Sequence, residues 1–157
     1  MTERVDQSLE FAQAKRIAFQ FLKVRNRSEV EIRQKFSQKK INQEVVEQTI
    51  AYLANLKLIN DRQFARDWIS MRLSKPYGLK RIFFELRQKG IKDDLIKEEF
   101  ERMNGIYNEQ NAITLLAQKR LAKYKNLELP KAKRRVFEFL SRRGFSLDSI
   151  KEAIEHL

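Results

Sequence analysis

Two segments of the chain repeat the same pattern of residues. The first, ELRQKGIKDDLIKEEF, spans residues 85–100, and the second, FLSRRGFSLDSIKEAI, spans residues 139–154. In each, a hydrophobic residue precedes a glycine by four positions and another follows it, and an acidic residue and Ile-Lys-Glu come later. Internal similarity of this length indicates a chain built from repeated supersecondary units.

A third copy of the pattern lies in EIRQKFSQKKINQEVVEQTI, residues 31–50. The aligned positions are Ile32, Phe36, Lys39, Ile41, Val46 and Ile50; Ile82, Leu86, Lys89, Ile91, Ile96 and Phe100; and Val136, Leu140, Arg143, Phe145, Ile150 and Ile154. A second pattern recurs upstream at intervals of 47 residues, in Ala18, Phe21, Leu22 and Arg25; Ala65, Trp68, Ile69 and Arg72; and Ala112, Leu115, Leu116 and Lys119. We therefore expect one domain over residues 1–157 made of three repeats, at 10–57, 58–106 and 107–157.

The hydrophobic spacing within each repeat predicts helices. Hydrophobic residues recur at i, i+3, i+4 and i+7, and strand alternation is absent. Only four glycines and two prolines interrupt a sequence rich in helix-forming residues. In the first repeat we expect helices over about residues 10–26, from a capping box at Ser28 and Glu31 to near Lys39, and over about 42–56. The predicted fold is all-α, an elongated array of three tandem three-helix repeats whose units contact mainly their neighbours.

Two glycines follow the second helix of their repeats. Gly90 and Gly144 occupy the position at which a chain often takes a left-handed conformation that only glycine adopts cheaply. We expect both to be structural turn residues. Lys40 occupies this position in the first repeat, so its turn should be strained by about 1 kcal/mol or differently shaped.

The positive charge indicates a polyanionic partner. The net charge is +12, and it is distributed along the whole chain. A basic globular protein usually binds nucleic acid or an acidic protein surface, although charge can also serve solubility alone. The cations concentrate between the first and second helices of each repeat, and several of the last group should lie in the loop before Pro130. The candidate binding residues are Arg25, Arg27, Arg72, Lys75, Lys80, Arg81, Lys119, Arg120, Lys123, Lys125, Lys131, Lys133, Arg134 and Arg135, with Lys15, Arg16 and Lys23 beside the first group.

A second interpretation applies to six cations. Arg25, Arg72 and Lys119 lie near the end of a first helix, and Lys39, Lys89 and Arg143 near the end of a second. Cations at these ends stabilise the helix dipole without any ligand. Most aromatic residues fall on the hydrophobic stripes and should pack in the core, while Phe84 and Phe139 flank the stripe and are candidates to face a partner.

The sequence indicates no enzyme. It lacks the common phosphate-binding and nucleophile motifs and has no cysteine, and its one histidine, His156, is the penultimate residue. We therefore expect no catalytic, cofactor or metal site. No signal peptide or membrane-spanning segment is evident, so we expect a cytoplasmic protein that does not bind membranes.

Three motifs resemble those of one family. Residues 59–91, INDRQFARDWISMRLSKPYGLKRIFFELRQKGI, are similar to the central motif of the RecX regulatory proteins. RNRSEVEIRQKF at 25–36 resembles the first-repeat motif of that family, and RRGFSLDSIKEAI at 142–154 resembles the last. The resemblance covers about residues 14–157, and Lys40 departs from it where many relatives have glycine.

The resemblance implies a function that the composition does not provide. RecX proteins are cytoplasmic bacterial modulators of RecA, the recombinase that polymerises on single-stranded DNA, and they act in recombination, DNA repair and the SOS response. The family implies a curved, elongated monomer that binds in the groove of the RecA filament. There it inhibits ATP hydrolysis, strand exchange and repressor co-cleavage, although the sign of the effect varies between bacteria. It also implies binding to single-stranded DNA, weak binding to duplex DNA, and no active site or cofactor.

Two other functions fit parts of the sequence. Three-helix units with short turns also occur in helix-turn-helix regulators, which read one duplex sequence in the major groove. A passive basic scaffold would have no effect on a recombinase. Sequence preference on duplex DNA separates the first alternative from a filament-binding protein.

Overall fold

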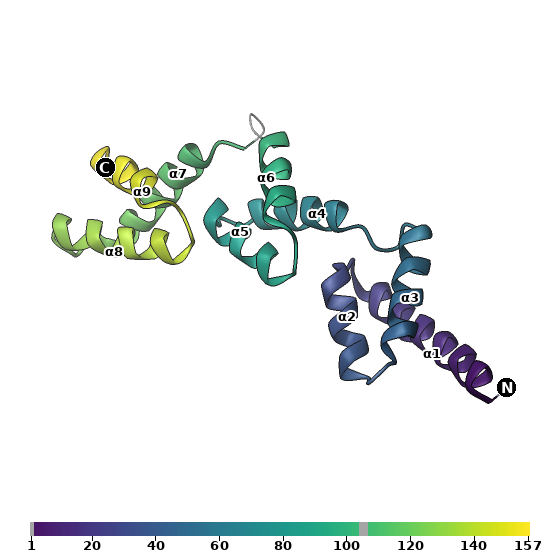
Figure 1. Cartoon of the computed structure of the whole chain (residues 1–157). Helices are drawn as coiled ribbons and strands as arrows, with labels where there is room; N and C mark the ends of the chain where they lie inside the picture. The colour runs from purple at the N-terminus through teal and green to yellow at the C-terminus, as the bar shows by residue number, and fades with distance from the viewer. Residues whose placement is uncertain (1, 104–106) are drawn as a thin grey trace. The chain divides into compact units, whose positions relative to one another are not determined.

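The computed structural model describes residues 2–103 and 107–157, with side chains from residue 7 onward (Figure 1). The expected end of the second repeat, at residue 106, lies outside the described residues. The described residues form nine α-helices, one 3-10 helix and no β-strand, which confirms the all-α prediction of three three-helix repeats. The helices are α1 (Thr2–Val24), α2 (Glu29–Gln38) and α3 (Gln43–Asn55); α4 (Asp61–Leu73), α5 (Leu79–Gln88) and α6 (Asp93–Arg102); and α7 (Glu109–Leu121), η1 (Ala122–Tyr124), α8 (Leu129–Arg142) and α9 (Leu147–Glu155).

The chain divides into two compact units. Unit 1 contains Met1–Arg66 and Gln88–Lys92, and unit 2 contains Asp67–Arg87 and Asp93–Leu157. The turn after α5 thus belongs to unit 1, although α5 itself belongs to unit 2 except for its last residue.

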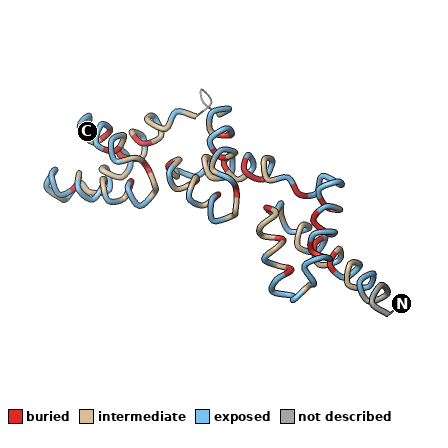
Figure 2. The backbone as a smooth tube through the Cα atoms, in the orientation of Figure 1, coloured by how far each residue is buried: buried red, intermediate tan, exposed pale blue. Residues whose placement is uncertain are grey.

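The core of unit 1 is built by one stripe from each of the first three helices. Figure 2 shows the buried positions along these helices. They are Ala14 and Ala18 of α1, Ile32 and Phe36 of α2, and Val45, Val46, Ile50 and Leu53 of α3, together with Ile59. The hydrophobic spacing in the sequence therefore identified the buried faces of these helices correctly.

The ends of α2 and α3 follow local capping rules. Ser28 accepts a hydrogen bond from the backbone of Glu31, whose side chain accepts one from the backbone of Ser28, so the predicted capping box is confirmed. Asn42 caps α3 by accepting from Glu44 N. Helix α1 begins earlier than expected, because Gln7 and Glu10 in its first half bind Glu44 and the backbone of Asn42.

The third repeat shows one error in the sequence alignment. The buried residues of α7 are Ile113 and Ala117, whereas Leu115, which was aligned with Phe21 and Trp68, is 54% exposed. Helices α4 and α7 both contain 13 residues, and their first residues, Asp61 and Glu109, lie 48 positions apart. The correct interval between these first helices is therefore 48 and not 47.

The three turns after the second helices share one backbone conformation. Gly90 and Gly144 have φ of 80° and 82°, and Lys40 has φ of 55°. The prediction of left-handed glycine turns is confirmed. Lys40 adopts the same turn with a side chain, which costs about 1 kcal/mol relative to glycine.

These glycines also allow close contact with the preceding repeat. In unit 1, a Cβ atom on Gly90 would overlap with the side chain of Val30 near the start of α2. Ser28 Oγ donates a hydrogen bond of 2.7 Å to Lys89 O in the same joint. The start of α2 therefore packs against the turn that follows α5.

Unit 2 contains the equivalent joint between the second and third repeats. A Cβ on Gly144 would overlap with Arg81, and a Cβ on Gly78 would overlap with the carbonyl of Gly144. Gly78 N donates a hydrogen bond of 3.0 Å to Arg143 O. The sequence did not indicate that residue 78 must be glycine, because Gly78 has no positive φ and does not directly follow a helix.

The joint in unit 1 contains a charged cluster around Glu31. Its carboxylate accepts hydrogen bonds from Arg25 at 2.7 and 3.0 Å and pairs with Lys89 Nζ at 2.8 Å. Burial alone would raise the pKa of Glu31, but the hydrogen bonds and charges of Arg25 and Lys89 lower it to about 2. The folded state therefore favours the ionised carboxylate.

We expect Glu31→Gln to lower the free energy of unfolding by about 2 kcal/mol at neutral pH, since Arg25 and Lys89 are both partly exposed. Because the folded pKa is the lower one, this contribution is fully present above the ordinary pKa near 4.5 and is lost as pH falls toward 2. Urea denaturation of both proteins between pH 7 and pH 3 measures it. The control is Glu47→Gln, which removes an exposed partner of Arg33. A difference between wild type and Glu31→Gln that does not shrink with falling pH would contradict this account.

Candidate functional site

The candidate basic residues differ in exposure. Arg25 and Arg27 lie in unit 1, and the other twelve lie in unit 2. The exposed ones are Lys75, Lys80, Lys119, Lys123, Lys125, Lys131, Arg134 and Arg135, and the half-buried ones are Arg25, Arg27, Arg72, Arg81, Arg120 and Lys133. The exposed side chains are therefore more accessible to a partner than the half-buried ones.

Three of the half-buried arginines form ion pairs inside the protein. Arg25 pairs with Glu31 in unit 1. In unit 2, Arg72 Nε lies 2.7 Å from Glu85 Oε2, in an ion pair without hydrogen-bond geometry, and Arg81 Nε donates to Glu85 Oε1 at 3.0 Å. Glu85 also accepts a 3.1 Å hydrogen bond from Trp68 Nε1. Arg25 and Arg72 thus have carboxylate partners inside the protein, which the helix-dipole interpretation did not include.

Arginines and aromatic rings alternate along the second and third repeats in unit 2. We call this set the arginine–aromatic series. The distances from guanidinium carbon to ring centroid are 4.9 Å for Arg72–Trp68, 5.4 Å for Arg72–Tyr77, 4.3 Å for Arg81–Tyr77, 5.1 Å for Arg143–Tyr77, 5.1 Å for Arg143–Phe139, 4.5 Å for Arg120–Phe139, 5.5 Å for Arg120–Tyr124 and 5.7 Å for Arg135–Tyr124. Each exposed pair of this kind contributes about 0.5–1 kcal/mol. Of these pairs, Arg143–Tyr77 connects the second and third repeats, and the others lie within one repeat.

The series covers one of the two aromatic residues that were candidates to face a partner. Phe139 is half-buried and is contacted by Arg120 and Arg143, so the protein itself covers part of its ring. Phe84 of α5 is 60% exposed, as expected for a residue outside the hydrophobic stripe. Lys80 is exposed one helical turn before Phe84.

The exposed cations of the third repeat are Lys119, Lys123, Lys125, Lys131, Arg134 and Arg135. The sequence placed several of them in the loop before Pro130, and Lys125 does lie there, whereas Lys119 is in the last turn of α7 and Lys123 in η1. Lys131, Arg134 and Arg135 belong to α8. Pro130 falls in the first turn of α8, where its missing N–H costs nothing, and so allows the helix to begin early. Arg134 pairs with Glu138 at 3.3 Å, but both side chains are largely exposed, so the pair holds Arg134 only weakly.

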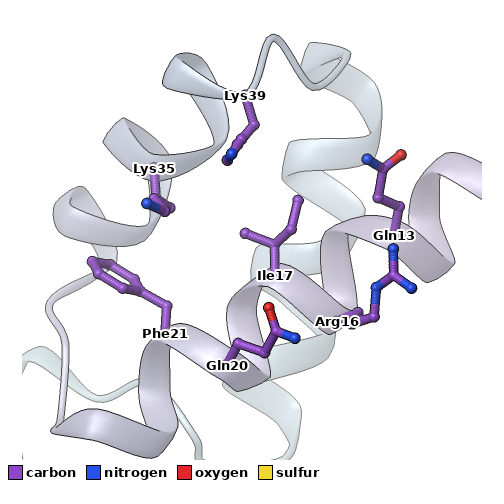
Figure 3. Close-up of a pocket in the computed structure, with 7 residues that line it drawn as sticks. All are labelled: Gln13, Arg16, Ile17, Gln20, Phe21, Lys35 and Lys39. Atoms are coloured by element: carbon purple, nitrogen blue, oxygen red, sulfur yellow. The ribbon is translucent and has the colours of Figure 1, made fainter.

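A groove between α1 and α2 lies apart from these candidates. Figure 3 shows side chains of both helices around it. Its volume is about 520 Å³, and we call it the α1–α2 groove. Its lining residues are Gln13, Arg16, Ile17, Gln20, Phe21, Lys35 and Lys39. The sequence analysis grouped Arg16 with other cations but did not connect it to Lys35 and Lys39, because only packing brings the two helices together.

The described part of the chain contains no group of three His, Cys, Asp or Glu residues that could hold a metal ion. His156 is exposed at the end of α9. Among the described helices, none has the length and hydrophobicity needed to cross a bilayer.

Comparison with known proteins places all three repeats in one family. Family models described as the first, second and third three-helix domains of RecX match residues 14–53, 60–98 and 108–154. Regulatory protein RecX of Finegoldia magna is 32% identical over 147 residues, which cover 90% of this chain and 70% of that protein. Its counterpart in Amycolatopsis mediterranei is 34% identical over 137 residues, covering 86% and 77%.

Solved structures show the same fold. The crystal structure of RecX from Lactobacillus salivarius has a TM-score of 0.82 at 23% identity, over 96% of this chain and 97% of that one. A crystal structure of regulatory protein RecX has a TM-score of 0.85 at 23% identity, over 99% and 78%. With three domain models matched in order and relatives above 30% identity over most of their length, the chain belongs to the RecX family of regulatory proteins.

Proposed function

We propose that the chain binds the filament that RecA forms on single-stranded DNA and inhibits its ATPase, strand exchange and co-protease activities. The observation that supports this most strongly is the match of all three RecX domains, in order, over residues 14–154. The proposal assigns no catalytic residue and no cofactor to the chain. It describes a cytoplasmic monomer whose partners are the recombinase filament and single-stranded DNA, with weaker binding to duplex DNA and none to membranes.

A protein of several three-helix repeats suits a polymeric partner. Each repeat can make one partial contact, and neighbouring filament subunits offer such contacts repeatedly. Linked weak contacts raise the affinity only where several can form together, so the assembled filament binds better than a free subunit. The chain then blocks further growth or the structural changes that accompany ATP hydrolysis.

The exposed cations of the third repeat are the proposed contacts to DNA phosphates. Helical arginines and lysines that lack strong internal partners are free to neutralise phosphates and release counterions. If about five phosphates are neutralised, the logarithm of the affinity for single-stranded DNA should fall with the logarithm of salt concentration with a slope of about −4.

The test compares two double variants in an assay of single-stranded-DNA-dependent recombinase ATPase. We expect Arg134→Glu/Arg135→Glu to require at least about tenfold more protein for half-maximal inhibition, because two exposed cations are reversed. The matched control is Lys92→Glu/Lys97→Glu, which reverses two exposed lysines outside the third repeat. Lys97 Nζ lies 3.9 Å from Asp94 Oδ1, and both side chains are exposed, so this ion pair is weak. The control should stay within about twofold of wild type.

Two outcomes would contradict the proposal. If both double variants inhibited the ATPase equally well, the third-repeat cations would not be contacts to the filament. A preference of about a thousandfold or more for one duplex sequence would instead favour a helix-turn-helix regulator.

A further inference from the structure

The α1–α2 groove carries an excess of positive charge. Arg16 on one side and Lys35 and Lys39 on the other line it, and none of the lining residues is acidic. Neither Arg16 nor Lys39 forms an ion pair with any described residue, and Lys35 only approaches the ring of Phe21, at 5.5 Å. Like charges gathered around one depression create a positive potential that attracts an anion.

The second repeat has an acidic residue at the position of Lys35. Lys35 aligns with Glu85, since Ile32 aligns with Ile82, and Phe21 aligns with Trp68. In the second repeat the carboxylate of Glu85 accepts a hydrogen bond from Trp68 Nε1 and pairs with Arg72. This acidic residue of α5 therefore connects α5 to α4. The first repeat has a lysine in place of this acid. Phe21 has no N–H to donate, and Arg25, the counterpart of Arg72, already pairs with Glu31. Lys35 therefore lines the groove without an acidic partner among the described residues, and a carboxylate of another molecule can pair with it.

The floor of the groove favours a peptide over a nucleic acid. Ile17 and Phe21 are half-buried and one helical turn apart, so they form an apolar strip beneath the cations. The guanidinium carbon of Arg27 lies 3.8 Å from the centre of the Phe21 ring, and this side chain occupies one face on which a base would stack. A phosphate chain gains little from an apolar floor, whereas a peptide can place a hydrophobic side chain on it and carboxylates beside it.

We propose that the α1–α2 groove is a docking site for an acidic peptide segment of another protein. The segment carries a hydrophobic side chain that rests on Ile17 and Phe21, and its carboxylates pair with Arg16, Lys35 and Lys39. This site goes beyond the function proposed above and involves none of the third-repeat cations.

The experiment uses the 157-residue chain, labelled for NMR, and two synthetic peptides of about 14 residues. Both are helix-forming and carry leucines spaced i, i+4, one flanked by glutamates and the other by glutamines. We expect the glutamate peptide to shift backbone amides of α1 and α2 and to bind at least about tenfold more tightly than the glutamine peptide.

Two variants on different helices locate the site. Lys35→Glu/Lys39→Glu and the single change Arg16→Glu should each weaken the glutamate peptide, the former by at least about tenfold. The matched control, Lys92→Glu/Lys151→Glu, reverses two exposed lysines outside the groove and should change the affinity by less than about twofold. The amide spectra also verify that every variant is folded.

Three results would overturn this inference: no amide shifts in α1 and α2, equal binding of the two peptides, or equal affinity of the groove and control variants. An oligo-dT strand of about 12 nucleotides that shifts the same amides and displaces the peptide would assign the groove to nucleic acid and also overturn it. Because no recombinase is present, the result is independent of the proposed effect on the filament.

Discussion

Gly144→Val should lower the free energy of unfolding of unit 2 by about 3 kcal/mol or more. Two costs combine at this position. Gly144 has φ of 82°, where a β-branched residue costs more than about 1–2 kcal/mol. Its new Cβ would also overlap with Arg81 at the joint between the second and third repeats, so α5 and the turn after α8 would have to move apart.

Lys40→Val is the matched control, because Lys40 occupies the same turn in the first repeat at φ of 55°. Lys40 is exposed and already adopts the left-handed conformation that is unfavourable for a residue with a side chain. We therefore expect Lys40→Val to lower the free energy of unfolding by only about 1 kcal/mol. Urea denaturation with circular dichroism measures both variants. Equal losses would mean that the glycine serves only its own turn and does not hold two repeats together.

Glu85→Ala should have the next largest effect, a loss of about 2–3 kcal/mol. Glu85 is 15% exposed and is the shared partner of Arg72, Arg81 and Trp68. Without it, the half-buried Arg72 loses its carboxylate within the arginine–aromatic series, and a poorly solvated charge without its partner is costly. We also expect the near-ultraviolet circular dichroism signal of Trp68 to weaken.

The control for Glu85 is Glu138→Ala, which breaks the exposed pair between Glu138 and Arg134. Such pairs contribute about 0–1 kcal/mol, so this variant should unfold almost as wild type does. If Glu85→Ala and Glu138→Ala had equal effects, the contacts of Glu85 with Arg72, Arg81 and Trp68 would not stabilise unit 2.

Much of the fold could be predicted because the relevant rules are local. The hydrophobic stripe of α2, the capping box at Ser28 and the left-handed turn at Gly144 each depend on a few neighbouring residues. The repetition of these signals also gave the number of repeats. The error of one residue in α7 arose because Leu115 and Leu116 look as suitable for a core as Ile113, and only packing separates them.

The candidate site was less predictable, since it depends on contacts between distant residues. Arg72 and Arg134 look alike in the sequence, but Arg72 contacts Glu85 and two aromatic rings, while Arg134 is mostly exposed. The need for glycine at residue 78 also comes from a distant turn, at Gly144. The place of Lys35 in the α1–α2 groove, where the second repeat has Glu85, also becomes visible only in the packed structure.

The most direct measurement is the ATPase rate of recombinase filaments on single-stranded DNA while the wild-type chain is titrated in. The account predicts that the rate falls progressively, and that it falls at chain concentrations well below those needed to bind free recombinase, since the contacts multiply only on the polymer. An unchanged rate at several-fold molar excess, with no chain associated with the filaments, would contradict it.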